Sequence, residues 1–220
     1  MIGTFSALLI SVLILGPAVT QEPQVDSFTE LHERAREVER TLVTLRADFV
    51  ETTESDLLAE RITARGTMVA SRPLRVLLRY DEPERKILLI DGNEMRMVWL
   101  ERREEEKMPL GEIEKAVDKY FYRVSQKELR RHFDIQVSSD PGLPGTHQID
   151  MIAKRKQVKK GLERLQIWLE ESTLFMVKMR MIYPAGVGSK TIELSNLRAN
   201  VPVEDEEFQI TLPPDPQTRQ

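Results

Sequence analysis

The sequence predicts a mainly β domain with additional helices, built on an antiparallel sheet, and three observations lead to this fold class. Four short apolar segments between Arg61 and Leu100 are separated by turn-forming pairs such as Asp91-Gly92. Adjacent apolar residues, as in Leu77-Leu78, put apolar side chains on both faces of these strands. Six further strand-like segments follow in the second half of the chain. A curved sheet around a cavity fits this pattern, and so does a sheet packed between a core and a helix.

The first predicted element is an amphipathic helix from Ser27 to about Val50. Ser27 and Glu30 have the spacing of a capping box at its start. Its apolar residues recur at steps of three and four, with charged residues between them: Phe28, Leu31, Ala35, Val38, Leu42, Leu45 and Phe49. We expect this apolar stripe to cover the sheet.

Ten strands are predicted from alternating apolar residues and the turns between them. They span residues 61–70, 74–80, 86–91, 94–100, 133–138, 147–153, 162–170, 174–183, 189–197 and 207–212. The charged stretch 101–111 is expected to form a solvated loop or a hairpin edge. Residues 112–122 and 125–133 are expected to form two short covering helices, the second beginning at Ser125 with Glu128 three residues later.

Composition bounds the class of protein. The chain has 220 residues, a formal net charge of -4 and no cysteine. The acidic balance gives no footprint for nucleic-acid binding, and the absence of cysteine excludes disulfides and thiolate metal sites. We expect one domain over residues 21–220, acting as a monomer without a cofactor.

The N-terminus resembles an export signal. The first 21 residues carry no charged side chain, and an apolar run over residues 5–15 is followed by Gly16-Pro17-Ala18-Val19-Thr20. This pattern predicts a signal segment over residues 1–20, cleaved ahead of Gln21, and a periplasmic protein. The alternative is an uncleaved signal that anchors the protein to the inner membrane.

Catalytic and metal-binding motifs are not evident. The histidines His32, His132 and His147 lie far apart, and the chain has no phosphate loop, nucleophile elbow or zinc motif. We therefore do not expect an enzyme. One basic cluster stands between two predicted strands, either as a solvated loop or as a contact for an anionic membrane or an acidic partner protein: Lys154, Arg155, Lys156, Lys159 and Lys160.

Methionine is concentrated in the predicted strands. Such residues either fill an ordinary core or form a deformable lining for an acyl chain, because methionine is unbranched and polarisable. Met95, Met97 and Trp99 share one face of a strand by alternation. The candidates for an apolar lining are Val76, Leu78, Tyr80, Leu89, Met95, Met97, Trp99, Val177, Met179 and Met181.

The order of these segments resembles the periplasmic outer-membrane lipoprotein carrier family (LolA-like). The segments that carry the resemblance are Leu45-Arg46-Ala47-Asp48-Phe49 at the end of the predicted helix, Gly66, Ser71-Arg72-Pro73-Leu74-Arg75-Val76, Tyr80-Asp81-Glu82-Pro83, Ile90-Asp91-Gly92-Asn93 and the closing stretches 168–181, 192–200 and 208–213. Most of the chain after residue 20 is covered. Val76 and Val98 depart from the family pattern, which often has a large aromatic residue at these positions.

The resemblance implies an incomplete, unclosed β-barrel of about eleven antiparallel strands, with a helical lid over an apolar cavity. That cavity would hold the acyl chains of lipoproteins or other lipids in transit. Cargo would come from an inner-membrane lipoprotein-releasing transporter and pass to an outer-membrane acceptor. Arg72 matches the arginine that ties the lid to the barrel through backbone carbonyls; otherwise it is an exposed residue before a strand. The alternative function is an envelope protein-binding or regulatory module on the same fold.

Overall fold

A computed structural model describes residues 27–73, 75–109 and 125–210 of the chain. Its helices are α1 (Ser27–Thr41), α3 (Gln126–His132) and α4 (Lys156–Lys159), with short 3-10 helices η2 (Pro184–Gly186) and η3 (Asp205–Phe208). Its strands are β1 (Thr44–Glu54), β2 (Ile62–Ser71), β3 (Arg75–Glu82), β4 (Lys86–Asp91), β5 (Glu94–Trp99), β6 (Glu104–Pro109), β7 (Phe133–Ser139), β8 (Thr146–Ala153), β9 (Arg164–Glu170), β10 (Met176–Tyr183) and β11 (Gly188–Ala199). No helix in this described part is long and apolar enough to cross a membrane.

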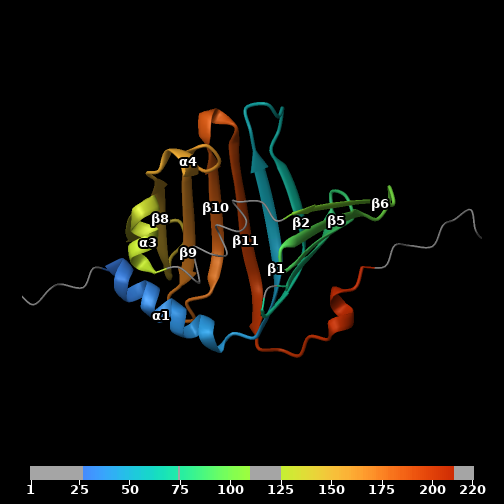
Figure 1. Ribbon diagram of the computed structural model, residues 1–220, viewed down its shortest axis with the longest axis horizontal. Coiled ribbons are helices and arrows are strands. Elements are labelled where there is room, and N and C mark those ends of the chain that lie inside the picture. Colours follow the sequence, from blue (N-terminus) through green and yellow to red (C-terminus); the bar gives the residue numbers. More distant parts are fainter. Residues whose placement is uncertain (1–26, 74, 110–124, 211–220) are drawn as a thin grey trace, which may run out of the picture.

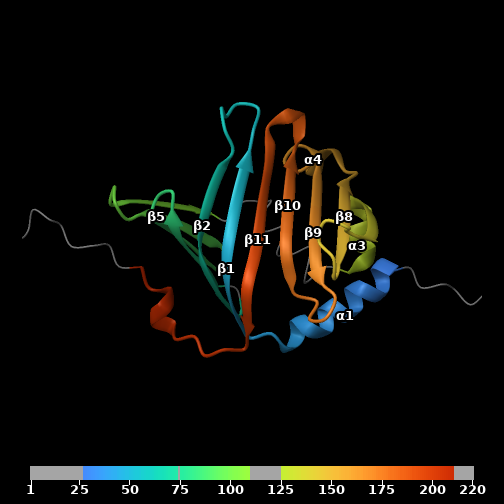
Figure 2. The same ribbon diagram turned by 180° about the vertical axis from the view of Figure 1, so that it is seen from behind.

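All eleven strands form one antiparallel sheet in the order β6-β5-β4-β3-β2-β1-β11-β10-β9-β8-β7. Strands β6 and β7 are its two edges and do not pair with each other, so the sheet is not closed. The sheet curves, with β5 and β6 turned steeply away from β8 to β11 (Figures 1 and 2). This architecture confirms the predicted unclosed barrel of about eleven strands.

The first predicted helix is wrong in its second half. Helix α1 ends at Thr41, and residues 44–54 form β1, which lies between β2 and β11. Leu45, Ala47 and Phe49 fit a period of two as well as one of 3.6, and β-branched Val50 and Thr52 favour a strand. Pairing with a neighbour on each side therefore decides the structure of this segment.

The strand predicted over residues 207–212 is also wrong where the structure describes it. Asp205–Phe208 forms η3, in which the side chains of Glu204 and Glu207 make a reciprocal capping box. This segment does not pair with β6 or β7, the two edge strands of the sheet. Without a strand partner, local capping favours a helical turn. The predicted signal at 1–20 and helix at 112–122 lie outside the described residues.

The mid-chain segments otherwise agree with expectation. The charged stretch contains the edge strand β6, and its exposed Glu and Lys side chains discourage pairing with another sheet. Helix α3 begins after Ser125, whose side chain accepts a hydrogen bond from the Glu128 backbone N–H. The short helix predicted at 125–133 is confirmed.

The two faces of the sheet are covered by different ends of the chain. Helix α1 lies across the lower ends of the β7 to β10 side (Figure 1), and its Phe28 and Leu31 pack in one core with residues of β7 to β10. We call this side the inner face. On the outer face, the segment 201–210 crosses β2 to β4, where Phe208 packs against Leu77 and Leu89.

Candidate ligand-binding face

The inner face of β2 to β5 carries rows of apolar side chains from neighbouring strands. Residues directly opposite each other in an antiparallel sheet point to the same face. One row consists of Met68, Leu78, Leu88 and Met97, and the next of Ala70, Val76, Ile90 and Met95. Trp99 follows beside Lys86 and Tyr80. The sheet thus brings Val76, Leu78, Tyr80, Met95, Met97 and Trp99 of the predicted lining together.

These inner side chains are only half-buried, whereas the outer side chains of the same strands are fully buried. Val76, Leu78, Met95, Met97 and Trp99 all retain solvent exposure. By contrast, the outward-facing Val69, Leu77, Ile87, Leu89 and Val98 are at most 8% exposed. Apolar surface that stays partly open on the side facing α1 is surface that a ligand can cover.

One of the predicted lining residues lies elsewhere, and a second falls at a bulge. Leu89 lies on the outer face against Phe208, because it alternates with Leu88 along β4. The assignment of Leu89 to the inner face is therefore wrong. Val177 is the extra residue at a register shift between Met176 and Lys178, and Met176 is the residue of this bulge that packs against the inner core.

Met179 and Met181 do reach the inner face, but in its filled half. Each is 9% exposed, and they share a core with Phe28 and Leu31 of α1 and with Leu129 of α3. The inner face is therefore divided. The half under α1 and α3 is packed, and the half over β2 to β5 is partly open.

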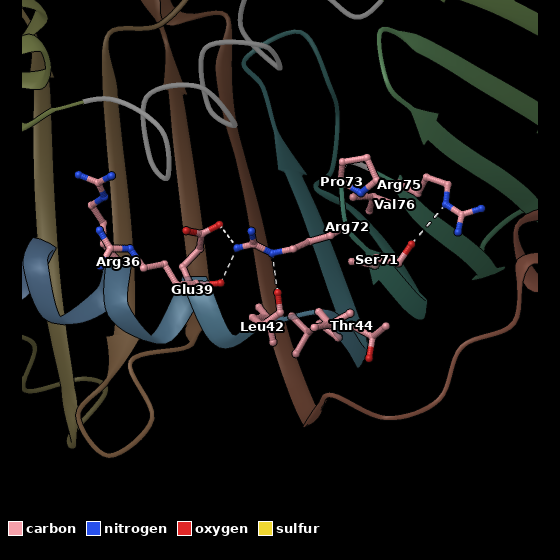
Figure 3. Close-up of a pocket in the computed structure, with 13 residues that line it drawn as sticks. Arg36, Glu39, Leu42, Thr44, Ser71, Arg72, Pro73, Arg75 and Val76 are labelled. Carbon is pink, nitrogen blue, oxygen red and sulfur yellow. Dashed lines mark hydrogen bonds and ion pairs between the residues drawn. The ribbon is translucent and has the colours of Figure 1, made fainter.

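Two cavities meet where α1 ends above the sheet. A cavity of about 170 Å³ lies beneath α1, and all its lining residues except Glu39 are apolar. A second cavity of about 530 Å³ opens between the end of α1 and the ends of β1 to β3 (Figure 3). Glu39, Leu42 and Leu45 line both. Ligand pockets typically measure about 300–1,000 Å³, so the cavity beneath α1 alone is too small for a lipid chain.

Arg72 links the sheet to the end of α1 at the boundary between the two cavities. Its Nε donates to the Leu42 carbonyl at 2.6 Å, and its Nη2 donates to the Glu39 carbonyl at 2.5 Å and also pairs with the Glu39 carboxylate. Figure 3 shows this side chain reaching across the pocket from the β2–β3 turn. A cation at a helix C-terminus also opposes the negative end of the helix dipole. These bonds are of the kind that the family resemblance implied for Arg72.

Tyr80 is a buried aromatic with a polar partner that sequence reasoning missed. Its hydroxyl donates to Glu51 Oε2 at 3.1 Å, and its ring meets Phe49 edge-on with centroids 4.9 Å apart. Gly66 lies against this pair, since a Cβ there would stand 3.0 Å from Phe49 Cε1 and 1.8 Å from the Arg79 carbonyl oxygen. Burial and the nearby Glu51 carboxylate raise the pKa of Tyr80, so the phenol stays protonated.

His32 is a buried polar side chain of α1. It is 7% exposed, and its ring lies 5.5 Å from that of Phe28. Both ring nitrogens are without a hydrogen-bond partner among the described residues. Burial, followed by the nearby Arg36 charge, lowers the pKa of His32. The neutral imidazole is therefore favoured in the folded state.

The predicted basic cluster lies away from these cavities, on and before α4 in the β8–β9 connection. All five of its Lys and Arg residues are exposed. The described residues contain no group of three or more His, Asp or Glu side chains placed to hold a metal ion. What the inner face offers is apolar surface bordered by one arginine link.

Comparison with known proteins relates the chain to a family of carriers. A family model described as outer membrane lipoprotein carrier protein LolA matches residues 40–211. A search of curated proteins found no match.

Solved structures share the fold at low sequence identity. An uncharacterized conserved protein from Thermus thermophilus is 10% identical with a TM-score of 0.52, covering 83% of this chain and 93% of that chain. A structure of MucB is 11% identical with a TM-score of 0.52, covering 83% of this chain and 62% of that chain.

Proposed function

The chain belongs to the LolA family of outer membrane lipoprotein carrier proteins, and on that premise we propose that it is a non-enzymatic periplasmic carrier of acylated lipoproteins or related lipids. The observation that carries this proposal is the partly open apolar face of β2 to β5, formed by Val76, Leu78, Met95, Met97 and Trp99. Such a face has the chemistry to hold acyl chains during transfer from the inner to the outer membrane.

The energetics of acyl binding fit this surface. Each buried CH₂ gains about 0.8 kcal/mol, so even part of one chain offsets the cost of association. Met68, Met95 and Met97 lie in adjacent rows, and flexible thioethers adapt to chains of different length without a fixed shape. A binding site of this kind selects for acyl character more than for one particular lipid.

The end of α1 is the proposed gate. The cavity beneath α1 is too small for an acyl chain, and, among the described residues, its one polar lining residue is Glu39, which Arg72 binds. Release of the Arg72 bonds to Glu39 and Leu42 frees the helix end to lift and joins the two cavities. Arg72 then favours the closed, empty carrier, which keeps apolar surface from water between rounds of transfer.

Partners follow from the family. An inner-membrane lipoprotein-releasing transporter would load the carrier, and an outer-membrane acceptor would unload it. A periplasmic location with the signal at residues 1–20 removed belongs to the same proposal.

The competing proposal is an envelope protein-binding or regulatory module on the same fold. MucB has this fold as well. In that case a protein segment covers the open face of β2 to β5, and no lipid is bound. The two proposals predict different co-purifying molecules.

Native mass spectrometry tests the proposal directly. The protein is exported, purified without detergent and sprayed intact, and bound material is then extracted with organic solvent. An acylated peptide or lipid bound at about one molecule per protein supports the carrier proposal, because a pocket of typical size holds one such ligand. A protein that is empty and ignores added diacyl ligand overturns it.

A further inference from the structure

Two basic segments that are distant in the sequence form one surface beside the sheet edge. The Lys154 Nζ donates to the Arg130 carbonyl at 3.0 Å, and the Arg155 Nε donates to the Arg131 carbonyl at 3.1 Å. The Lys154 backbone N–H also donates to the His132 carbonyl at 2.8 Å. The segment leading into α4 is thus fastened to the C-terminal end of α3, and the two helices lie near each other (Figures 1 and 2).

We call residues 126–134 and 154–160 together the α3–α4 surface. It carries eight Lys or Arg side chains and two acidic ones, whereas the whole chain has a net charge of -4. Both acidic side chains are already paired, Glu128 with Arg131 at 3.3 Å and Asp134 with Lys154 at 3.1 Å. The remainder of the chain therefore holds a net negative charge, and the molecule has a strong charge asymmetry.

Three lysines of this surface point away from the core with their charges free. Val158 of α4 packs against the core, whereas Lys156 and Lys159 of the same helix and Lys160 at its C-terminal cap extend toward solvent. All three are exposed, and no described residue forms a hydrogen bond or ion pair with their ammonium groups. No described residue neutralises these three charges, so they do not stabilise the fold through ion pairs.

We propose that the α3–α4 surface docks the carrier on an anionic phospholipid bilayer. The arginines here have internal roles, because Arg155 and Arg131 make the contacts above and Arg130 lies 5.1 Å from the Phe28 ring centroid. The free cations are all lysines, which act as hydrated point charges and do not require the fixed geometry of a bidentate partner. The two cavities at the end of α1 are lined by other residues. An extended anionic surface fits free lysines without a pocket better than an acidic peptide does.

This inference rests on the proposed carrier function and specifies where it takes place. A carrier that exchanges acyl chains must come close to a membrane, and weak attraction lengthens its stay there without anchoring it. Each Lys near an anionic surface contributes about 1 kcal/mol, which is about fivefold in partitioning. The attraction is screened when the Debye length falls from about 30 Å at 0.01 M salt to about 3 Å at 1 M.

Vesicle co-sedimentation tests the inference. The purified protein is mixed with vesicles of phosphatidylglycerol and phosphatidylcholine, or with phosphatidylcholine alone, at low and high salt. The test variant is Lys156→Gln with Lys159→Gln and Lys160→Gln. The control removes three other exposed cations, Arg61→Gln, Arg65→Gln and Arg85→Gln, and so changes the net charge equally.

The expected result is binding to anionic vesicles only, at low salt only, and a loss on the order of 100-fold in the lysine variant but not in the arginine control. Equal losses of vesicle binding in both variants would show that net charge alone causes the effect, and would overturn the α3–α4 surface as the docking site. Absence of vesicle binding by the unaltered protein would also overturn it and leave an acidic protein as the partner. A fluorescent acyl ligand, added without vesicles, reports on carrier function separately, and the lysine variant is expected to bind it normally.

Discussion

Replacing Arg72 by leucine is the sharpest test of the proposed gate. The change removes the two bonds to the Glu39 and Leu42 carbonyls and the ion pair with the Glu39 carboxylate. The side chains of Arg72 and Glu39 are 44% and 25% exposed, so solvent screening limits the ion pair to about 0–1 kcal/mol. With the two charge-assisted hydrogen bonds, weakened by the same exposure, the total loss is about 2 kcal/mol. We therefore expect the population with the α1 end undocked to rise about 30-fold.

Hydrogen exchange measures this population directly. In Arg72→Leu, amides in the last turns of α1 should lose protection by about 30-fold, while amides of β9 and β10 keep theirs. Arg40→Leu is the matched control, because Arg40 is exposed and, among the described residues, its charge pairs with Glu37 of the same helix at 2.8 Å. The exchange of an acyl ligand should change in Arg72→Leu alone. Equal α1 protection in the two variants would refute the gate.

Four further substitutions probe the two faces and the buried histidine. Leu78→Glu should fold and lose acyl binding, because Leu78 is a half-buried inner residue. Leu77→Glu should instead lower the urea midpoint sharply, because that side chain is 1% exposed on the outer face. Equal stability of the two variants would contradict the assignment of these residues to opposite faces of β3. Phe208→Ala should cost about 3 kcal/mol in urea unfolding, since it empties the outer contact with Leu77; an unchanged midpoint would show that the 201–210 segment adds no stability. For His32, whose pKa is lowered on folding, stability is complete above the unfolded value near 6.5 and declines as the pH falls below it toward the folded pKa. His32→Leu should therefore flatten the pH dependence of the urea midpoint below about pH 6.5, and an identical dependence in both proteins would show that His32 does not titrate against folding.

The local alternation of apolar residues was sufficient to predict most strands of the sheet. It failed where pairing with neighbouring strands decides the structure. Alternation and turn residues located nine of the eleven strands approximately. Strand β1 was hidden because Leu45 and Phe49 satisfy two periods at once, and only its place between β2 and β11 separates them. The bulge at Val177 has no sequence signal such as glycine, so the facing of β10 changes without warning.

The candidate site was predictable in composition but not in extent. Alternation correctly grouped Met95, Met97 and Trp99, yet sequence pattern cannot say which face a distant segment covers. Neighbouring Leu88 and Leu89 are equally apolar, and it is Phe208, more than a hundred residues later, that buries Leu89 on the outer face. Of the α3–α4 surface, the sequence predicts only the basic cluster at residues 154–160. Its other Lys and Arg residues lie in α3, which the fold brings beside this cluster.

The most direct test of an acyl-binding inner face uses the two tryptophans of the chain, one on each face. Trp99 lies half-buried on the inner face beside Tyr80 and Lys86, whereas Trp168 is buried on the outer face and donates to Asp140 Oδ2 at 2.8 Å. A fatty acid brominated along its chain quenches tryptophan emission on contact, and the unbrominated acid is the control. Trp168→Phe, which retains Trp99, should be quenched by the brominated acid, and Trp99→Phe should not. Quenching of Trp168 alone, or of neither residue, would contradict a ligand site on the inner face of β2 to β5.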